Sequence, residues 1–281
     1  MRTGRLTFIF ETALVLLFLS IIFAPPIKTF FSPHEGHSKT EKREFAPFPG
    51  IPNDLSSALS FPSQFEAYFN DHFGFRDFFI YRYQREMRQW FSKTGSKLAL
   101  QGRDNWLFFT GDDLMEDYRG LVPLSDQELT DWVDEQNRKE EWLRRQGIRY
   151  VLFVVPNKQS IYPEYLPGYI QASKGTTRFE QVLNHLGGEL PAYMLNLHTV
   201  LRDSKNKKPY QLYYKTDTHW NMLGAYIGFQ YVFDRISQWY PDETFTTEFS
   251  FYETLQDTSR SDLSVMLMME DRSSEKTLHL K

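Results

Sequence analysis

The chain of 281 residues contains no cysteine. It can therefore form neither a disulfide nor a thiolate zinc site. It also lacks a strong charge bias, because 32 Lys and Arg stand against 36 Asp and Glu, and we expect no nucleic-acid partner. We find no internal repeat. A chain of this length can hold one sizeable domain with appendages.

A long apolar run follows the first five residues. Leu6 to Ile27 spans 22 residues, about 33 Å as a helix, which is enough to cross a bilayer. Arg2 and Arg5 precede it, so the positive-inside rule places the N-terminus in the cytoplasm and the bulk of the chain in the periplasm. A cleaved signal peptide is the alternative, but the run is long for one and no small-x-small cleavage site precedes its prolines. We predict an uncleaved inner-membrane anchor over residues 1–27.

Residues 28–60 are polar and charged at first and then punctuated by prolines, which indicates a tether off the membrane. His34 and His37 lie in this tether. With no further ligand type near them, we interpret both histidines as exposed side chains and not as a metal site. Residues 61–281 form the predicted folded domain.

The domain begins with two predicted helices and a hairpin. Aromatic residues recur at three- and four-residue steps from Phe61 to Phe91, with a break near Gly74. His72 beside Asp71 could be catalytic, but hydrogen bonds within a helix corner explain it more simply. Residues 97–109 predict a hairpin, because two apolar segments flank a Gly-Arg-Asp-Asn turn.

Helices and strands then alternate. Ser125 and Glu128 form a capping box at the start of a helix that ends at Gly147. Tyr150 to Val155 is an unbroken apolar run, which is typical of a parallel strand buried on both faces. This order predicts an α/β layered sheet. The later expected elements are helix 177–186, strand 193–197, a short helix or turn at 199–204, strand 210–214 and helix 220–239.

The strongest chemical signal is Asp217 two residues before His219, between an expected strand and an expected helix. A carboxylate can hold one ring nitrogen of a histidine and leave the other free to act as a base. The alternative is that Asp217 or Thr218 only caps the following helix, and the spacing by itself favours this alternative. A metal site would need a third ligand such as His198, and nothing in the spacing demands one. We therefore expect no metal.

A second polar segment directly follows the expected strand 150–155. Sites in open α/β sheets form outside the carboxyl ends of strands. Asn157 could donate to an oxyanion, and Lys158 could contact an anionic sugar or an acyl donor. A polar loop that merely closes the strand is the alternative for both residues.

Several segments together resemble the alginate O-acetyltransferase family of AlgX and AlgJ, distant relatives of the SGNH hydrolases. Each segment alone is weak evidence for this family, but the order and spacing of all the segments together are specific to it. The resemblance covers most of the chain after the tether. Its segments are Phe69–Arg76, Gly102–Phe109, Val155–Lys158, Ile161–Pro167 and Asp217–Trp220.

The resemblance implies a fold, an activity and partners. The fold would be an SGNH hydrolase-like three-layer α/β sandwich, here incomplete at its C-terminus, behind an N-terminal transmembrane helix. The activity would be acetyl transfer to hydroxyls of an alginate-like exopolysaccharide, with a membrane-bound O-acyltransferase as the acetyl source and no cofactor. Asp217 and His219 would activate a serine that carries the acetyl group. Asn157, Lys158 and Trp220 are the predicted substrate contacts.

The nucleophile is the point at which the sequence departs from the family. In the family the serine follows the Asp-x-His pair in its own strand-end turn, and this chain has 62 residues after His219. Its serines there lie in no small-residue turn, and Ser160 lacks the glycines of a nucleophile turn. Ser261-Asp262-Leu263-Ser264 resembles the segment that precedes the family's nucleophile. We expect that the nucleophile is missing because the sequence is truncated. The second explanation is that the chain is an inactive paralogue.

Three functional hypotheses remain open from the sequence. The first is a periplasmic polysaccharide O-acetyltransferase. The second is a non-catalytic glycan-binding or scaffold protein of an exopolysaccharide assembly complex, with aromatic side chains stacked on sugars. The third is an esterase that transfers acetyl to water.

Overall fold

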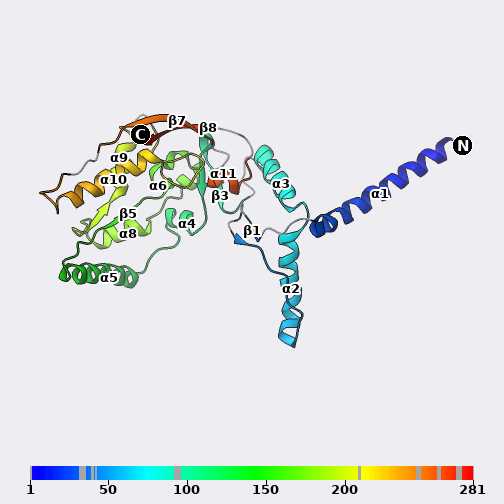
Figure 1. Ribbon diagram of the computed structural model, residues 1–281, viewed down its shortest axis with the longest axis horizontal. Helices are drawn as coiled ribbons and strands as arrows, with labels where there is room; N and C mark the ends of the chain where they lie inside the picture. The colour runs from blue at the N-terminus through cyan, green and yellow to red at the C-terminus, as the bar shows by residue number, and fades with distance from the viewer. Residues whose placement is uncertain are drawn as a thin grey trace. The chain divides into compact units, whose positions relative to one another are not determined.

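The fold is taken from a computed structural model, which describes residues 2–31, 36–38, 41, 43–91, 96–207, 210–244, 248–257, 261–269 and 274–280. These residues belong to two compact units, Met1–Gly95 and Ser96–Lys281. The predicted boundaries at residues 27 and 60 stay predictions. Figure 1 labels the elements along the chain.

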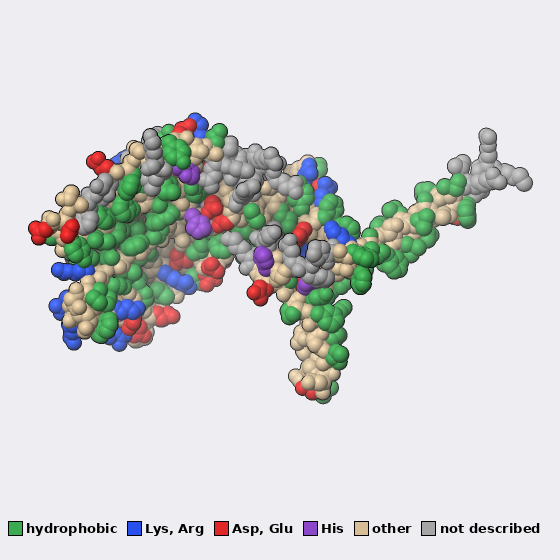
Figure 2. All heavy atoms as spheres, in the orientation of Figure 1, with side chains coloured by type: hydrophobic (Ala, Val, Ile, Leu, Met, Phe, Trp, Pro, Cys, Tyr) green, Lys and Arg blue, Asp and Glu red, His purple; other side chains and the backbone are tan. Residues whose placement is uncertain are grey.

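The first unit is built from three helices and a small strand pair. Its elements are α1 (Arg2–Phe31), β1 (His37–Ser38), β2 (Arg43–Glu44), α2 (Leu55–His72) and α3 (Arg76–Phe91). Within α1, Phe8–Phe31 has a mean hydropathy of 2.3 and is almost wholly exposed, and Figure 2 shows hydrophobic side chains along its length. Among the described residues it is the one helix with the length and composition of a membrane span, which fits an anchor or a signal sequence.

The predicted break near Gly74 is confirmed as a corner between α2 and α3. Phe75 takes a φ of +67° there. Gly74 is needed because a Cβ on it would lie 2.2 Å from the Pro25 carbonyl oxygen of α1. His72 stacks on Tyr68 at 4.2 Å, and its Nδ1 lies 2.9 Å from the Tyr68 carbonyl oxygen. His72 therefore serves the corner, as predicted. Of the two tether histidines, His34 lies outside the described residues.

The second unit holds the remaining elements. Its strands form two-stranded sheets, with β3–β4 and β7–β8 antiparallel and β5–β6 parallel. The strands are β3 (Ala99–Gln101), β4 (Leu107–Phe109), β5 (Leu152–Val154), β6 (Met194–Asn196), β7 (Phe251–Asp257) and β8 (Ser274–Leu280). The α-helices are α4 (Leu114–Tyr118), α5 (Asp126–Arg145), α6 (Lys158–Ile161), α7 (Gly168–Gln171), α8 (Arg178–His185), α9 (Leu197–Lys205), α10 (Met222–Ser237) and α11 (Asp262–Met266), with 3₁₀ turns at Arg103–Asn105 and Pro163–Tyr165.

Most predicted elements are confirmed within one to four residues at their ends. The hairpin pairs Ala99 with Phe109, the capping box of Ser125 and Glu128 starts α5, and the later helices 177–186 and 220–239 correspond to α8 and α10. The parallel pairing of β5 with β6 confirms the α/β alternation.

Two strand predictions are wrong in part. Residues 210–214 form no strand, because only Tyr213 bridges Trp220 and the rest of the segment closes a loop. Strand β5 is buried on one face only. Leu152 and Val154 pack on the α5–α8 side, whereas Phe153 and Val155 are 43% and 40% exposed.

The largest core lies under the loop between Tyr213 and α10. Trp106 and Phe108 are fully buried there, and the Trp106 ring stacks on Tyr165 at 4.4 Å. Leu212 and Tyr213 belong to the same cluster. The core therefore fixes both the start of the loop and the floor beneath it.

Candidate active site

The loop that carries Asp217 and His219 is closed at its base by backbone contacts. Tyr213 bridges Trp220, and the Asn221 amide donates to the Leu212 carbonyl at 2.9 Å. The Asn221 side chain accepts from the Gly224 amide at 3.0 Å and so caps α10. The alternative that Asp217 or Thr218 caps this helix is therefore wrong, because the cap lies at Asn221. Asp217 and His219 project from the loop itself.

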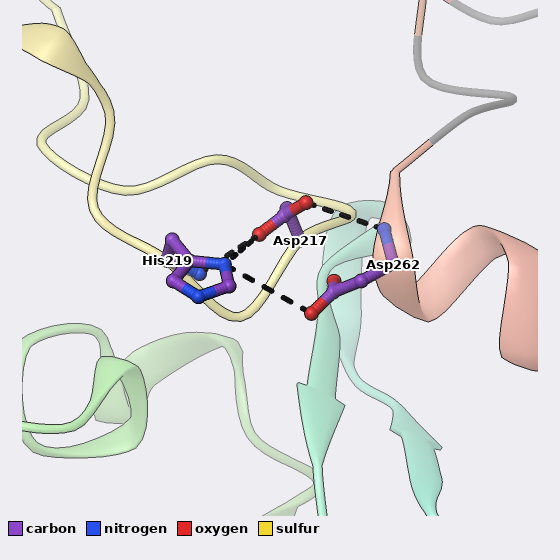
Figure 3. Close-up of side chains that lie close together, drawn as sticks. All are labelled: Asp217, His219 and Asp262. Atoms are coloured by element: carbon purple, nitrogen blue, oxygen red, sulfur yellow. Dashed lines mark hydrogen bonds and ion pairs between the residues drawn. The ribbon is translucent and has the colours of Figure 1, made fainter. Parts of the chain in front are cut away.

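Asp217 holds His219, which the family resemblance implies and which the spacing alone did not favour. Oδ1 of Asp217 lies 2.6 Å from Nδ1 of the ring and accepts the His219 backbone amide at 3.0 Å. Figure 3 shows the other ring nitrogen, Nε2, on the side away from both carboxylates. The Asp217 side chain is 18% exposed and the His219 side chain 74%. This pairing favours the tautomer with the proton on Nδ1, so the Nε2 lone pair faces the surface and can accept a proton.

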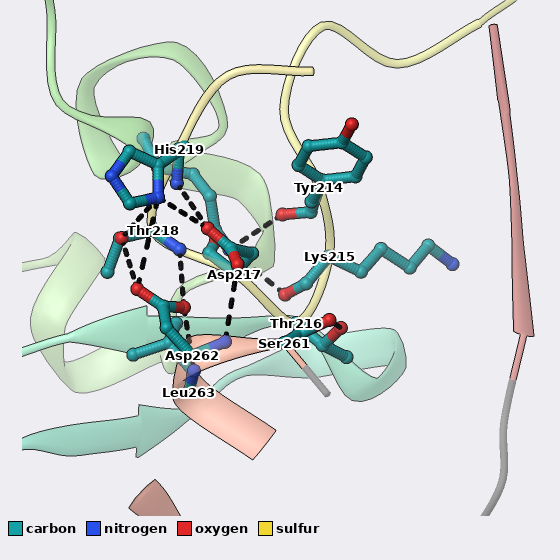
Figure 4. Close-up of polar contacts among 10 residues, drawn as sticks. Tyr214, Lys215, Thr216, Asp217, Thr218, His219, Ser261, Asp262 and Leu263 are labelled. Carbon is teal, nitrogen blue, oxygen red and sulfur yellow. Dashed lines mark hydrogen bonds and ion pairs between the residues drawn. The ribbon is translucent and has the colours of Figure 1, made fainter. Parts of the chain in front are cut away.

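Asp262 is a second carboxylate at the ring, and sequence reasoning did not select it. Its Oδ2 lies 4.0 Å from His219 Nδ1. The carboxylate accepts the Thr218 amide at 2.9 Å and the Thr218 hydroxyl at 2.5 Å, while its own amide donates to Asp217 Oδ2 at 3.2 Å. Figure 4 shows these contacts joining the loop to the first turn of α11. The signal in the sequence was the Ser261–Ser264 segment, which the family resemblance had already singled out.

These contacts keep Asp217 ionised. Burial raises the pKa of its carboxyl, but hydrogen bonds from the His219 amide and ring and from the Asp262 amide outweigh burial and hold the pKa below its usual range. Asp217 therefore carries a full negative charge beside the ring at neutral pH.

Lys158 supports the same loop from below. Its ammonium is buried and donates to the carbonyl oxygens of Tyr214, Lys215 and Asp217 at 2.9, 2.9 and 2.8 Å. The Nζ also lies about 5 Å from the centres of the Trp106 and Phe108 rings. Burial lowers the pKa of Lys158 to about 7, against the attraction of the carboxylates of Glu275, Asp217 and Asp262. The three carbonyls use all three ammonium protons.

The residues of this site lie within a segment that matches a known family. A model of the family described as "SGNH hydrolase-like domain, acetyltransferase AlgX" matches residues 99–278, more than half of the chain and all of the site described above. The chain belongs to the AlgX family. Its predicted SGNH hydrolase-like α/β fold is thereby confirmed, as is the predicted family itself.

Curated relatives of the AlgX family are similar over about half of this chain. The "Probable alginate O-acetylase AlgJ" of Pseudomonas putida is 26% identical over 137 residues, covering 49% of this chain and 33% of the relative. The protein of the same name from Pseudomonas aeruginosa is 29% identical over 127 residues, covering 44% and 29%. The matched region of this chain thus spans about a third of these relatives.

Two solved structures are also similar at a distance. The O-acetyltransferase domain of Pseudomonas putida AlgJ aligns with a TM-score of 0.39 at 20% identity, covering 65% of each chain. Bacillus cereus PatB1 aligns with a TM-score of 0.42 at 20% identity, covering 65% of this chain and 57% of that one.

The other predicted site residues of this AlgX-family chain differ in how they are placed. Asn157 is partly buried and precedes α6, but its side chain does not cap that helix. Trp220 is half-buried and packs on α10 over Gly224 and Gly228. The contacts of Asn157, Lys158 and Trp220 with a substrate stay predictions.

Among the residues that the structure describes, no serine hydroxyl forms a hydrogen bond with His219. Ser261 and Ser264 are buried, and the Ser261 hydroxyl accepts from Thr216 at 3.0 Å. Ser259 and Ser273 lie outside the described residues. His198, the considered metal ligand, is half-buried with its pKa lowered by burial, and it is not in the cluster of His219, Asp217 and Asp262, whose ligand atoms lie within 4.8 Å of one another.

Proposed function

We propose that this AlgX-family chain is an O-acetyltransferase that acetylates hydroxyls of an exopolysaccharide in the periplasm, held to the inner membrane by α1. The observation that carries the proposal is the contact of 2.6 Å between Asp217 and His219 Nδ1, with the ring exposed. The alginate O-acetylase names of the relatives support a polysaccharide acceptor. A membrane-bound O-acyltransferase is the proposed acetyl source.

The proposed chemistry uses His219 as the base twice. The nucleophile is a serine that none of the described residues supplies. Nε2 takes the proton of its hydroxyl as that oxygen attacks the acetyl carbonyl, and returns the proton to the leaving group of the donor, which leaves an acetyl-serine. Nε2 then takes the proton of a sugar hydroxyl, whose oxygen attacks the acetyl carbon. The proton returns to the serine oxygen as it leaves. Asp217 holds the ring and balances the positive charge that the imidazolium carries in between.

The test is acetyl transfer from p-nitrophenyl acetate to alginate oligosaccharides, followed by mass spectrometry. Removal of a general base costs about 10²- to 10⁴-fold in rate, so His219→Ala should lose transfer to that extent. His185→Ala, at the exposed end of α8, is the matched control and should keep the wild-type rate. Transfer by His219→Ala at the wild-type rate would remove His219 from the mechanism.

The second candidate is a glycan-binding scaffold, and one observation favours it. None of the described serines contacts His219. If the wild-type chain binds the oligosaccharide but transfers no acetyl, and His219→Ala binds it equally well, the scaffold is the better description. Ester hydrolysis that needs no sugar acceptor would instead indicate the esterase.

A further inference from the structure

The helices α2 and α3 of the first unit expose more apolar surface than a water-facing helix pair normally does. Their exposed large side chains include Leu59, Phe65, Phe69, Phe79, Tyr83 and Trp90, with Leu59 at 74% and Trp90 at 70%. Among them, Phe65 contacts the ring of Phe48, in the extended segment before α2, at 6.3 Å between ring centres.

The aromatic side chains follow the helical period, whereas the exposed Leu59 falls about 120° from Phe65 on α2. On α2, Phe61, Phe65 and Phe69 recur every four residues, and their rings stack at 6.1 and 6.4 Å. On α3, Phe79 and Tyr83 are four residues apart and Trp90 follows seven residues later, which places all three on one side.

Arg85 is exposed and, at 100° per residue, lies about 140° from the mean direction of Phe79, Tyr83 and Trp90. Arg82 borders the aromatic side, about 80° from that direction, and the exposed Phe78 lies beside Arg85. A helix with an aromatic side bordered by arginines is of the type that lies in a membrane–water interface. Trp and Tyr also concentrate at this level of a bilayer.

Contacts with α1 place the corner between these helices at the end of the apolar span. The Gly74 amide donates to the Thr29 hydroxyl at 2.8 Å, and Lys28 Nζ lies 4.2 Å from the centre of the Phe75 ring. The span Phe8–Phe31 has 24 residues, about 36 Å of helix, against about 30 Å of hydrocarbon. Its last turn therefore reaches the lipid headgroups and holds the corner there.

The directions of α2 and α3 also agree with a position at the lipid headgroups. In Figure 1, α2 and α3 leave the end of α1 in opposite directions, crosswise to it. In Figure 2, hydrophobic side chains line the side of α2 that is turned toward α1. A bilayer around α1 would meet that side.

We propose that α2 and α3 lie in the outer headgroup region of the membrane that α1 crosses, with Leu59, Phe69, Tyr83 and Trp90 inserted among the lipids. The occupant of this apolar surface is the bilayer itself. This inference rests on the anchor role of α1 in the proposed function and is independent of the chemistry of His219.

The absence of native cysteine allows single spin labels on the full chain. The chain would be reconstituted in vesicles of phosphatidylethanolamine and phosphatidylglycerol, and collisions with oxygen and with a water-soluble nickel complex would be measured by electron paramagnetic resonance. Tyr83→Cys and Leu59→Cys are the test positions. Arg85→Cys and Gln64→Cys are exposed controls on the other sides of the same helices, and Phe18→Cys reports the middle of α1.

The expected result is a ratio of oxygen to nickel collisions several-fold higher at residues 83 and 59 than at residues 85 and 64. Equal ratios within each pair would place both sides in water and overturn the proposal. Shielding of residue 83 from both reagents would indicate a protein partner and also overturn it. If residue 18 itself meets the nickel complex freely, α1 is no anchor, and both this proposal and the membrane part of the proposed function fail while acetyl transfer stays testable.

Discussion

Replacing Lys158 by methionine should release the loop that carries Asp217 and His219. Methionine keeps most of the length of lysine and its contact with the rings of Trp106 and Phe108, but it has no donor. The carbonyls of Tyr214, Lys215 and Asp217 then lose their shared partner.

The size of the effect follows from two opposing contributions. Each hydrogen bond to a charged group contributes roughly 1.5–3 kcal/mol, so three bonds give a gross loss of about 4.5–9 kcal/mol. Burying the ammonium costs several kcal/mol, and the substitution removes that cost. We therefore expect Lys158→Met to lower the free energy of unfolding by about 2–4 kcal/mol.

The local effect separates a loosened loop from a general loss of stability. Among the amides that bond to carboxylates within the site are those of Thr218, His219 and Asp262. Their hydrogen exchange should accelerate in Lys158→Met, whereas amides of α5 should change only as far as global stability changes. Lys215→Met is the matched control, because the Lys215 side chain points away from the cluster in Figure 4.

Kinetics distinguish support of the loop from the predicted contact with substrate. A displaced base lowers kcat, by about 100-fold for a shift near 1 Å, and leaves KM for the acceptor nearly unchanged. A lost substrate contact raises KM instead. Wild-type exchange rates at the three site amides, together with an unchanged kcat, would refute the role assigned to Lys158.

Three further perturbations test the surroundings of the loop. The pKa of Asp217 is lowered in the folded protein, so the ionised carboxylate stabilises the fold above about pH 4. This stabilisation is lost as the pH falls through the lowered pKa. In urea titrations at acid pH, the difference in unfolding free energy between wild type and Asp217→Asn should therefore shrink. Gly224→Ala places a Cβ 2.3 Å from the Leu212 carbonyl oxygen and should cost about 1–3 kcal/mol in thermal unfolding, whereas Gly228→Ala, 3.1 Å from a movable Trp220 ring, should cost less. Thr216→Val removes the buried bond to Ser261 and should cost about 1 kcal/mol; no loss of Tm would show that this bond does not join the loop to α11.

Local patterns predicted those parts of the fold that depend on neighbours in the sequence. The capping box of α5, the hairpin of β3 and β4 and the corner at Gly74 each need only a few adjacent residues. The contact of Asp217 with His219 joins residues two positions apart. The spacing allowed this contact but favoured a helix cap, and the family resemblance implied the pair.

The remaining parts of the site depend on contacts across long stretches of chain. Asp262 reaches Thr218 from 44 positions away, and Lys158 reaches Asp217 from 59 positions away. No periodicity or spacing encodes such contacts. The same limit applies to β5. Its apolar run indicated burial on both faces, but Phe153 is partly exposed. The residues of a strand do not determine which elements pack against it.

These long-range contacts explain how two carboxylates can lie beside one histidine without disturbing it. Asp217 is held by the amides of His219 and Asp262, and Asp262 is held by the amide and hydroxyl of Thr218. Each carboxylate therefore has its own donors and a fixed direction. When Nε2 accepts a proton, the positive charge on the ring forms beside two carboxylates on its Nδ1 side, which need not move to meet it. This fixed arrangement is the condition for electrostatic stabilisation during proton transfer.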